Sequence, residues 1–292
     1  RPGRDALYAA MGLSAPRAKR MTVLQQDCFG PAVGVSFEAA RQVALAIASA
    51  RRATRVESVP LSMASGRVLA RPIVAPRSLP SFDQAAMDGY AVNSAGLTSR
   101  SSALPVVGRT DAGDRPGTLE PGTAQRIMTG AALPAGADAV VMQECVTSLD
   151  GSIQFHGPVS ADMHVRRTGE DIVEGRTVLG AGRTIRWPET ALLAALGVSV
   201  VPVVPLLHVA ILTTGSELRR PGQALAGGDI FDSNGPMLGA LLAMPSVDMT
   251  LSTSDDDIDA IASALQKFAE TSSMVVTAAG MACGDRDYVR TA

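Results

Sequence analysis

The sequence predicts a multidomain chain of the α/β plus β class, in which a small β-rich domain precedes a doubly wound α/β domain. Between about residues 82 and 185, short β-type runs alternate with Gly- and Pro-containing turns, and helical periodicity is absent. From about residue 188 onward, apolar strands alternate with helices, which is typical of a parallel sheet covered on both faces. A chain of 292 residues with 46% hydrophobic content can bury the cores of two or three domains.

The N-terminal part is predicted to contain a leader and then one helix. Residues 1–34 mix Pro, Gly, Arg and Gln without periodicity, and we expect a disordered leader. Because the chain begins with Arg1 rather than Met, we expect the reading frame to start further upstream. Ser36 can cap a helix from residue 37 to about residue 52. The next predicted elements are extended segments at 56–59 and 68–74, separated by a helical turn at 61–65.

The C-terminal part begins with a predicted helix at 188–196, where Pro188 occupies a favoured first-turn position. The predicted elements after it are strand 208–213, helix 235–244, strand 247–252, helix 258–270 and strand 274–278. A doubly wound domain needs at least one more helix and strand to close, so we expect this domain to be incomplete. The apolar run 191–213 is long enough to cross a bilayer. However, Pro202 and Pro205 would each remove a backbone donor, so a helix and two buried strands are favoured and no membrane span is expected.

Charge and cysteine content exclude several functions. The formal net charge of −2 gives no attraction to nucleic acid or to an anionic membrane. The three cysteines are far apart and form no CxxC pair, so neither a zinc site nor a disulfide framework is predicted. This pattern favours the reducing cytoplasm. The three histidines lack metal-ligand spacing.

A ligand site is predicted at the carboxyl ends of the parallel strands, where open α/β sheets bind their ligands. Two glycine-containing loops leave those ends, at residues 213–217 and 279–287. The carboxylates at the same edge are Glu217, Asp232, Asp256 and Asp287. They would repel a phosphate unless a cation lay between, so the residues predict a Mg²⁺–phosphate site. The alternative is that these are ordinary loop residues, because any α/β domain has such glycines and acids. No GxGxxG motif or P-loop is present.

A second candidate lies at residues 81–92, where Asp83 and Asp88 are five residues apart in an irregular stretch. From the residues alone, a tight turn at Asp88-Gly89 is favoured over a catalytic role.

Several motifs together resemble the MoeA/gephyrin E-domain family of molybdopterin molybdenumtransferases. The most specific is FDQAAMDGYAV at residues 82–92, which is similar to the family's FDNSAMDGYAV. The others, in family order, are 126–131, 138–144, 167–172, 214–218, 232–234 and 284–288. The resemblance extends from about Val35 to the last residue.

The resemblance implies a domain order and an activity. An elongated linker domain (35–80 and 155–187) would carry a β-barrel-like domain (81–154), followed by a molybdopterin-binding α/β domain (188–292). Members of this family insert molybdate into adenylylated molybdopterin with a divalent cation, here Mg²⁺, and release AMP. They are homodimers with a shared active site, and the molybdopterin adenylyltransferase of the same pathway is a further implied partner.

The resemblance also implies roles for individual residues, and it favours a catalytic Asp88 over the tight turn. The implied catalytic residues are Asp88, Thr129, Asp171 and Glu217, and the implied metal ligands are Asp88, Glu217 and Asp256. The implied substrate-binding residues are Thr214, Gly215, Ser216, Ser233, Asn234, Gly280, Gly284 and Asp287.

The chain departs from the family at several positions. Ala279 and Ala282 stand in the usual Gly-Gly-Val-Ser run, Gln84 and Ala85 replace Asn and Ser, and Gly235 stands where many relatives carry Arg. These departures motivate an alternative function, a non-catalytic molybdopterin-binding or scaffold paralogue. The family also has C-terminal segments that this sequence lacks, so this chain alone is expected to be inactive or a fragment of an active protein.

Overall fold

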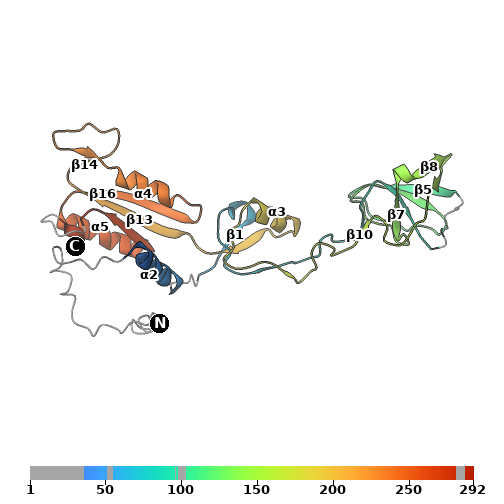
Figure 1. Cartoon of the computed structure of the whole chain (residues 1–292), viewed down its shortest axis with the longest axis horizontal. Coiled ribbons are helices and arrows are strands. Elements are labelled where there is room, and N and C mark those ends of the chain that lie inside the picture. Colours follow the sequence, from blue (N-terminus) through green and yellow to red (C-terminus); the bar gives the residue numbers. More distant parts are fainter. Residues whose placement is uncertain (1–35, 51–54, 96, 98–102, 281–286) are drawn as a thin grey trace. The chain divides into compact units, whose positions relative to one another are not determined.

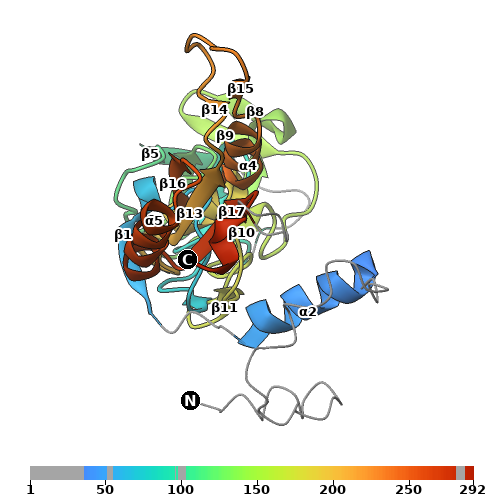
Figure 2. The same ribbon diagram turned by 90° about the vertical axis from the view of Figure 1, so that its left-hand side faces the viewer.

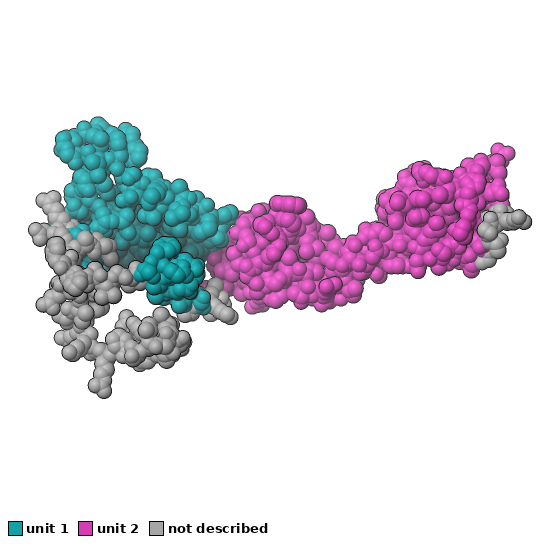
Figure 3. All heavy atoms as spheres, in the orientation of Figure 1, with its two compact units in different colours: residues 1–54, 206–292 teal, residues 55–205 magenta. Residues whose placement is uncertain are grey.

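The structure is a computed structural model that describes residues 36–50, 55–95, 97, 103–280 and 287–292. The chain divides into two compact units (Figure 3), one formed by residues 1–54 and 206–292 and the other by residues 55–205. The predicted leader at 1–34 and the predicted site residue Gly284 lie outside the described residues.

One part of the 55–205 unit is built on an antiparallel strand pair and a helix. Strand β1 (Glu57–Pro60) pairs with β12 (Val200–Val203), and helix α3 (Trp187–Ala195) lies between them in sequence. The 3₁₀ helix η1 (Leu61–Met63) follows β1 directly. A shared hydrophobic core includes Val59, Leu69, Ile73, Ile185, Leu193, Val201 and Val203. Because β12 pairs with β1, α3 and β12 belong to this unit, whereas the predicted α/β domain began at residue 188.

Two short antiparallel pairs lead from this core toward the β-rich part of the same unit. Strand β2 (Ile73–Val74) pairs with β11 (Thr177–Leu179), and β3 (Gln84–Ala85) pairs with β10 (Val165–Arg166). These pairs hold the chain segment that enters the β-rich part beside the segment that leaves it.

The β-rich part contains a mixed sheet with the strand order β7-β4-β6-β5-β9-β8, counting the described residues. Its strands are β4 (Gly89–Val92), β5 (Leu104–Thr110), β6 (Ala124–Ile127), β7 (Ala139–Met142), β8 (Val146–Leu149) and β9 (Ser152–Phe155). The 3₁₀ helix η2 (Gln143–Cys145) joins β7 to β8. Val92, Ala124, Val141 and Ile153 are buried together in its core. The predicted β-rich character of this region is confirmed.

The other unit contains a parallel sheet whose described strands follow the order β16-β13-β17. Strand β13 (Leu207–Thr214) pairs on one side with β16 (Val247–Ser254) and on the other with β17 (Met274–Ala278). Helix α4 (Asn234–Leu242) and helix α5 (Ile258–Thr271) lie on opposite faces of this sheet (Figures 1 and 2). The alternating pattern predicted from the sequence is therefore confirmed, and strand β17 has the predicted bounds.

Side-chain alternation along β13 explains how both helices pack. Ala210 and Leu212 are fully buried against Ile261 and Phe268 of α5. Thr213, on the other face, is hydrogen bonded to Asp232, just before α4. The Asp257 side chain accepts a hydrogen bond from the Ala260 amide and so caps α5.

The remaining elements of this unit are α2 (Phe37–Ala50), β14 (Leu218–Arg219), β15 (Ile230–Phe231) and η3 (Tyr288–Arg290). Strands β14 and β15 pair in parallel and form a ribbon. The apolar run 191–213 is distributed over α3, β12 and β13, as predicted. In the described part of the chain, no helix has the length and apolar character that crossing a bilayer requires.

Candidate functional site

Asp88 and Thr129, both predicted catalytic residues, are in direct contact. Asp88 lies immediately before β4, and Thr129 follows β6 in a turn. The Oδ1 atom of Asp88 accepts hydrogen bonds from the Thr129 hydroxyl at 2.6 Å and from the Thr129 amide at 2.8 Å. The Thr129 hydroxyl and then its amide lower the pKa of Asp88, and the positive charges of Arg126 and Arg109 act in the same direction. Within the described residues the other carboxylate oxygen, Oδ2, accepts no hydrogen bond, so it remains open to a ligand.

The glycine after Asp88 is required by strand packing. Gly89 begins β4 and pairs with Met142 of β7, so the tight turn favoured by the residues alone is wrong. A Cβ atom at Gly89 would lie 2.0 Å from the carbonyl oxygen of Val141. Glycine therefore allows β4 and β7 to approach closely, and this approach fixes the backbone next to Asp88.

Two arginines near Asp88 were not identified from the sequence. Arg126 on β6 is opposite Tyr90 on β4, and its guanidinium carbon lies 4.9 Å from the centre of the Tyr90 ring. Arg109 on β5 is in register with Arg126 because an irregularity between Val106 and Gly108 shifts the pairing. Strand register cannot be read from a local pattern, so the pairing of Arg109 with Arg126 was not predicted, although Arg126 begins the motif at 126–131.

Asp83, the second carboxylate of the same motif, connects two distant segments of the chain through a hydrogen bond and an ion pair. Asp83 accepts a hydrogen bond from the Thr168 amide at 2.8 Å and forms an ion pair with Arg167. The Thr168 amide is the main cause that lowers the pKa of Asp83, and Arg167 adds to it. These contacts join residues 83 and 168 across the two segments that enter and leave the β-rich part.

Asp171 lies in a different environment from Asp88. Its carboxylate accepts a hydrogen bond from Arg166 at 2.6 Å, and both residues line a cavity of about 370 Å³. Phe82 and Gln84 line the same cavity, whereas Asp88 and Thr129 do not. The structure thus brings two of the three predicted catalytic residues of this unit together and leaves Asp171 apart from them.

In the α/β unit, the loops after β13 and β16 place the predicted carboxylates Glu217 and Asp256 at the ends of these strands. The Ser216 hydroxyl accepts a hydrogen bond from the Asp256 amide at 3.0 Å, and the Ser216 amide donates to the Asp256 carboxylate at 3.3 Å. The Glu217 carboxylate folds over Gly215, where a Cβ atom would lie 2.8 Å from each of its oxygens. Glu217 and Asp256 therefore lie on two adjacent loops, which follow the neighbouring strands β13 and β16.

Thr214 and Gly280 form a close approach at the same edge of the sheet. The Thr214 hydroxyl is buried and has no hydrogen-bond partner among the described residues. A Cβ atom at Gly280 would lie 2.9 Å from this hydroxyl and 2.6 Å from a methyl group of Val289. The Val289 amide donates to the Gly280 carbonyl at 3.1 Å, so the segment that starts at Asp287 returns to this loop. A buried hydroxyl without a partner is an available donor for a ligand.

The predicted binding residues Ser233 and Asn234 are exposed at the start of α4. Their neighbour Asp232 is 5% exposed and accepts hydrogen bonds from the Thr213 hydroxyl at 2.8 Å and the Gly235 amide at 2.9 Å. Asp232 therefore holds the first turn of the helix, and Ser233 makes no side-chain cap.

The carboxylates offer oxygen ligands of the kind that Mg²⁺ prefers. In the part of the chain that the structure describes, no three acidic, histidine or cysteine residues are close enough to hold a metal together. Glu217 and Asp256 lie in one unit and Asp88 lies in the other. The residue types thus fit a magnesium site, but the described residues of neither unit bring three such ligands together.

Comparisons with known proteins agree with this description. A family model described as "MoeA N-terminal region (domain I and II)" matches residues 35–197, and one described as "Probable molybdopterin binding domain" matches residues 210–292. A curated relative from Mycobacterium tuberculosis, molybdopterin molybdenumtransferase 2, is 38% identical over 84% of this chain and 62% of its own length. The molybdopterin molybdenumtransferase of Haemophilus influenzae is 36% identical over 81% of this chain and 59% of its own length.

A solved structure, a molybdopterin biosynthesis MoeA protein from Pyrococcus horikoshii, aligns with a TM-score of 0.74 and 32% identity. The alignment covers 86% of this chain and 64% of that chain. The sequence thus spans about three fifths of the length of the curated relatives named above. Since the N-terminal family model alone matches more than half of the sequence, the chain belongs to the MoeA family.

Proposed function

We propose that the protein is a molybdopterin molybdenumtransferase, which inserts molybdate into adenylylated molybdopterin and releases AMP during molybdenum cofactor biosynthesis. The observation that carries this proposal is the hydrogen-bonded pair of Asp88 and Thr129 in the motif that resembles the family most closely. The relatives at 36–38% identity bear the name of this enzyme. Because the chain spans about three fifths of their length, the proposal concerns the whole protein.

The chain's own residues have complementary roles in this reaction. The pKa of Asp88 is lowered by Thr129, so its carboxylate stays ionised, and its open Oδ2 atom can orient an attacking water. The Thr214 hydroxyl, and the Gly280 backbone that approaches it, can donate hydrogen bonds to the substrate. Asp88, Glu217 and Asp256 would hold Mg²⁺, which would neutralise negative charge on the substrate phosphate.

We infer that the active site is shared in a homodimer, with Asp88 from one subunit facing the Glu217 and Asp256 loops of the other. The resemblance implies this arrangement. It would bring together three carboxylate ligands for Mg²⁺, which the described residues of a single unit do not do. The molybdopterin adenylyltransferase of the same pathway is a further proposed partner, because it would deliver the adenylylated substrate. Both proteins would act in the cytoplasm.

A non-catalytic molybdopterin-binding or scaffold paralogue is the second candidate. The observation that favours it is Ala279, which has a φ of +72° at a position where the family usually has glycine. An alanine in this left-handed conformation strains the loop that approaches Thr214.

The test is AMP release from adenylylated molybdopterin, with and without Mg²⁺ and molybdate, in the full-length protein. Asp88→Asn should keep the fold and strongly reduce AMP release, because an amide cannot replace the carboxylate in orienting water or holding the cation. Asp150→Asn is the matched control, since Asp150 lies in an exposed turn of the same unit and its φ of +35° is one that Asn tolerates. Wild-type AMP release by Asp88→Asn would refute the assigned role. Substrate binding without any AMP release in the wild type would favour the paralogue.

A further inference from the structure

Arg126 on strand β6 is connected to Asp88 through two neighbouring residues. Gln143 makes one connection, because its amide donates to the Asp88 carbonyl at 3.1 Å and its side-chain oxygen accepts a hydrogen bond from Arg126. Thr129, three residues after Arg126, makes the other by donating its hydroxyl to Asp88 Oδ1 at 2.6 Å. The Cα partner of Arg126 on β4 is Tyr90, two residues after Asp88. Arg126 and the open Oδ2 atom of Asp88 therefore belong to the same small region of the β-rich sheet.

Two neighbours hold the Arg126 side chain in place. Its guanidinium carbon lies 4.9 Å from the centre of the Tyr90 ring, and its Nη2 atom donates to Oε1 of Gln143. Gln143 is itself held, because its Nε2 atom donates to Glu144 at 3.1 Å. Contact with an aromatic ring covers one face of the guanidinium and leaves the N–H groups on its edge available. Because this long side chain is already ordered, it would lose little further conformational freedom when it binds a ligand.

The charge of Arg126 is not neutralised by a carboxylate among the described residues. Arg109, its partner on β5, differs in this respect, because Arg109 Nη2 lies 2.8 Å from Oδ1 of Asp111. A guanidinium has five N–H donors, and the described hydrogen bonds of Arg126 use one of them. Arg126 therefore keeps both a positive charge and free donors for an anion.

A cation is needed here if an anionic substrate is to approach Asp88, because the carboxylate would repel it. Molybdate and the phosphate of an adenylyl group are both tetrahedral oxyanions, and the planar fork of arginine can donate two parallel hydrogen bonds to such a group. We propose that Arg126, positioned by Tyr90 and Gln143, binds a tetrahedral oxyanion of the substrates beside Asp88, either molybdate or the adenylyl phosphate. This inference rests on the proposed function, which supplies both anions.

The experiment is calorimetric titration of molybdate and of AMP, separately, into the 292-residue chain. Arg126→Gln should weaken the binding of at least one of them by about ten-fold, because it removes charge-assisted hydrogen bonds. Arg126→Lys should recover part of this loss, since it keeps the charge but not the planar fork. A loss for molybdate alone identifies molybdate as the anion, and a loss for AMP alone identifies the adenylyl phosphate. If neither anion binds to the wild type, or if Arg126→Gln changes neither affinity, the inference is overturned.

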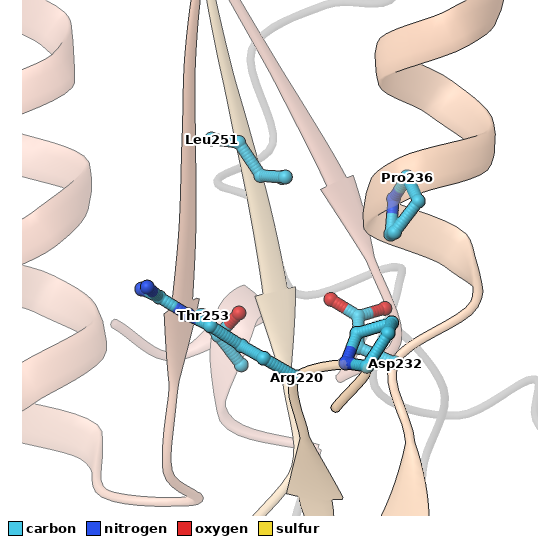
Figure 4. Close-up of a pocket in the computed structure, with 6 residues that line it drawn as sticks. Arg220, Asp232, Pro236, Leu251 and Thr253 are labelled. Carbon is cyan, nitrogen blue, oxygen red and sulfur yellow. The ribbon is translucent and has the colours of Figure 1, made fainter. Parts of the chain in front are cut away.

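Arg115→Gln is the matched control, because Arg115 is an exposed arginine in the connection between β5 and β6. It removes the same charge from the same unit and should leave both affinities unchanged. A second control addresses binding elsewhere, since Arg220 lines a cavity of about 240 Å³ in the α/β unit (Figure 4). The loss caused by Arg126→Gln should be the same in an Arg220→Gln background, because distant independent sites add. Weaker binding in Arg220→Gln together with wild-type binding in Arg126→Gln would overturn the inference.

Gln143→Ala distinguishes anion binding from a merely structural role of Arg126. This substitution removes the hydrogen bond that positions the guanidinium but keeps its charge, and Gln143 is exposed. It should weaken binding of the same anion by a smaller factor than Arg126→Gln does. If Arg126→Gln lowers the Tm and leaves the affinities unchanged, the role is structural and the proposal is wrong. If Arg126→Gln fails to fold, Gln143→Ala and Arg126→Lys decide the question.

The two proposals can fail separately, because anion binding needs no turnover. Anion binding that depends on Arg126, together with absence of AMP release by the full-length protein, would support the anion site and refute the enzymatic function. AMP release whose KM for molybdate and for adenylylated molybdopterin is unchanged in Arg126→Gln would refute the anion site alone.

Discussion

Replacing Ala279 by glycine should stabilise the α/β unit, although most core and loop substitutions destabilise proteins. Ala279 has a φ of +72°, and the left-handed conformation costs a residue with a Cβ atom roughly 1–2 kcal/mol. Glycine removes this strain, but its larger conformational freedom in the unfolded chain costs about 0.5–1 kcal/mol. The expected net stabilisation is about 0.5–1 kcal/mol, which raises the Tm of a domain of this size by about 2–8 °C.

The assay is thermal and urea unfolding of the 292-residue chain, with Ala278→Gly as the matched control. Ala278 ends strand β17 and pairs with Thr213, so the same substitution there should destabilise the unit by about 0.5–1 kcal/mol. Gly280→Ala should also destabilise it, because Gly280 has a φ of +69° and a Cβ atom there would lie 2.6 Å from Val289. If Ala279→Gly lowered the Tm as Ala278→Gly does, the strain at this position would be refuted.

Three further predictions concern the core, an ion pair and the candidate site. Leu212→Ala should cost about 2–5 kcal/mol in urea unfolding, because Leu212 is fully buried against α5; a cost below about 1 kcal/mol would contradict this packing. Two arginines, Arg183 first, lower the pKa of Glu189 to about 2. The ionised Glu189 carboxylate therefore stabilises the fold fully above its ordinary pKa of 4.5, and this stabilisation is lost as the pH falls toward about 2. Glu189→Gln should make the Tm fall less steeply over this pH range. An unchanged dependence of the Tm on pH would refute the pairing. Thr129→Val should raise the pKa of Asp88 toward its ordinary value in an NMR titration, and an unchanged pKa would show that the hydroxyl bond is unimportant.

The order of helices and strands in the α/β unit could be predicted because it depends on local patterns. Strand 274–278 has the predicted bounds, and the helix predicted at 258–270 is observed at Ile258–Thr271. Apolar runs and capping residues such as Asp257 act over a few residues, so a single sequence contains the information. The role of Asp88 could not be predicted from its local pattern, which favoured a turn. Only the resemblance of its motif to a known family indicated a functional site.

Contacts between distant residues were decided by the tertiary structure. Asp88 and Thr129 are 41 positions apart, and their hydrogen bonds exist because β4 and β6 are neighbours in the sheet. Which strands pair also decides two other features. One is the pairing of β12 with β1, and the other is the register that places Arg109 beside Arg126. The burial of Asp232 follows from the packing of α4 against β13. The sequence by itself therefore determined the elements and the family motifs, whereas strand partners, register and the environment of each carboxylate depend on long-range packing that no local pattern specifies.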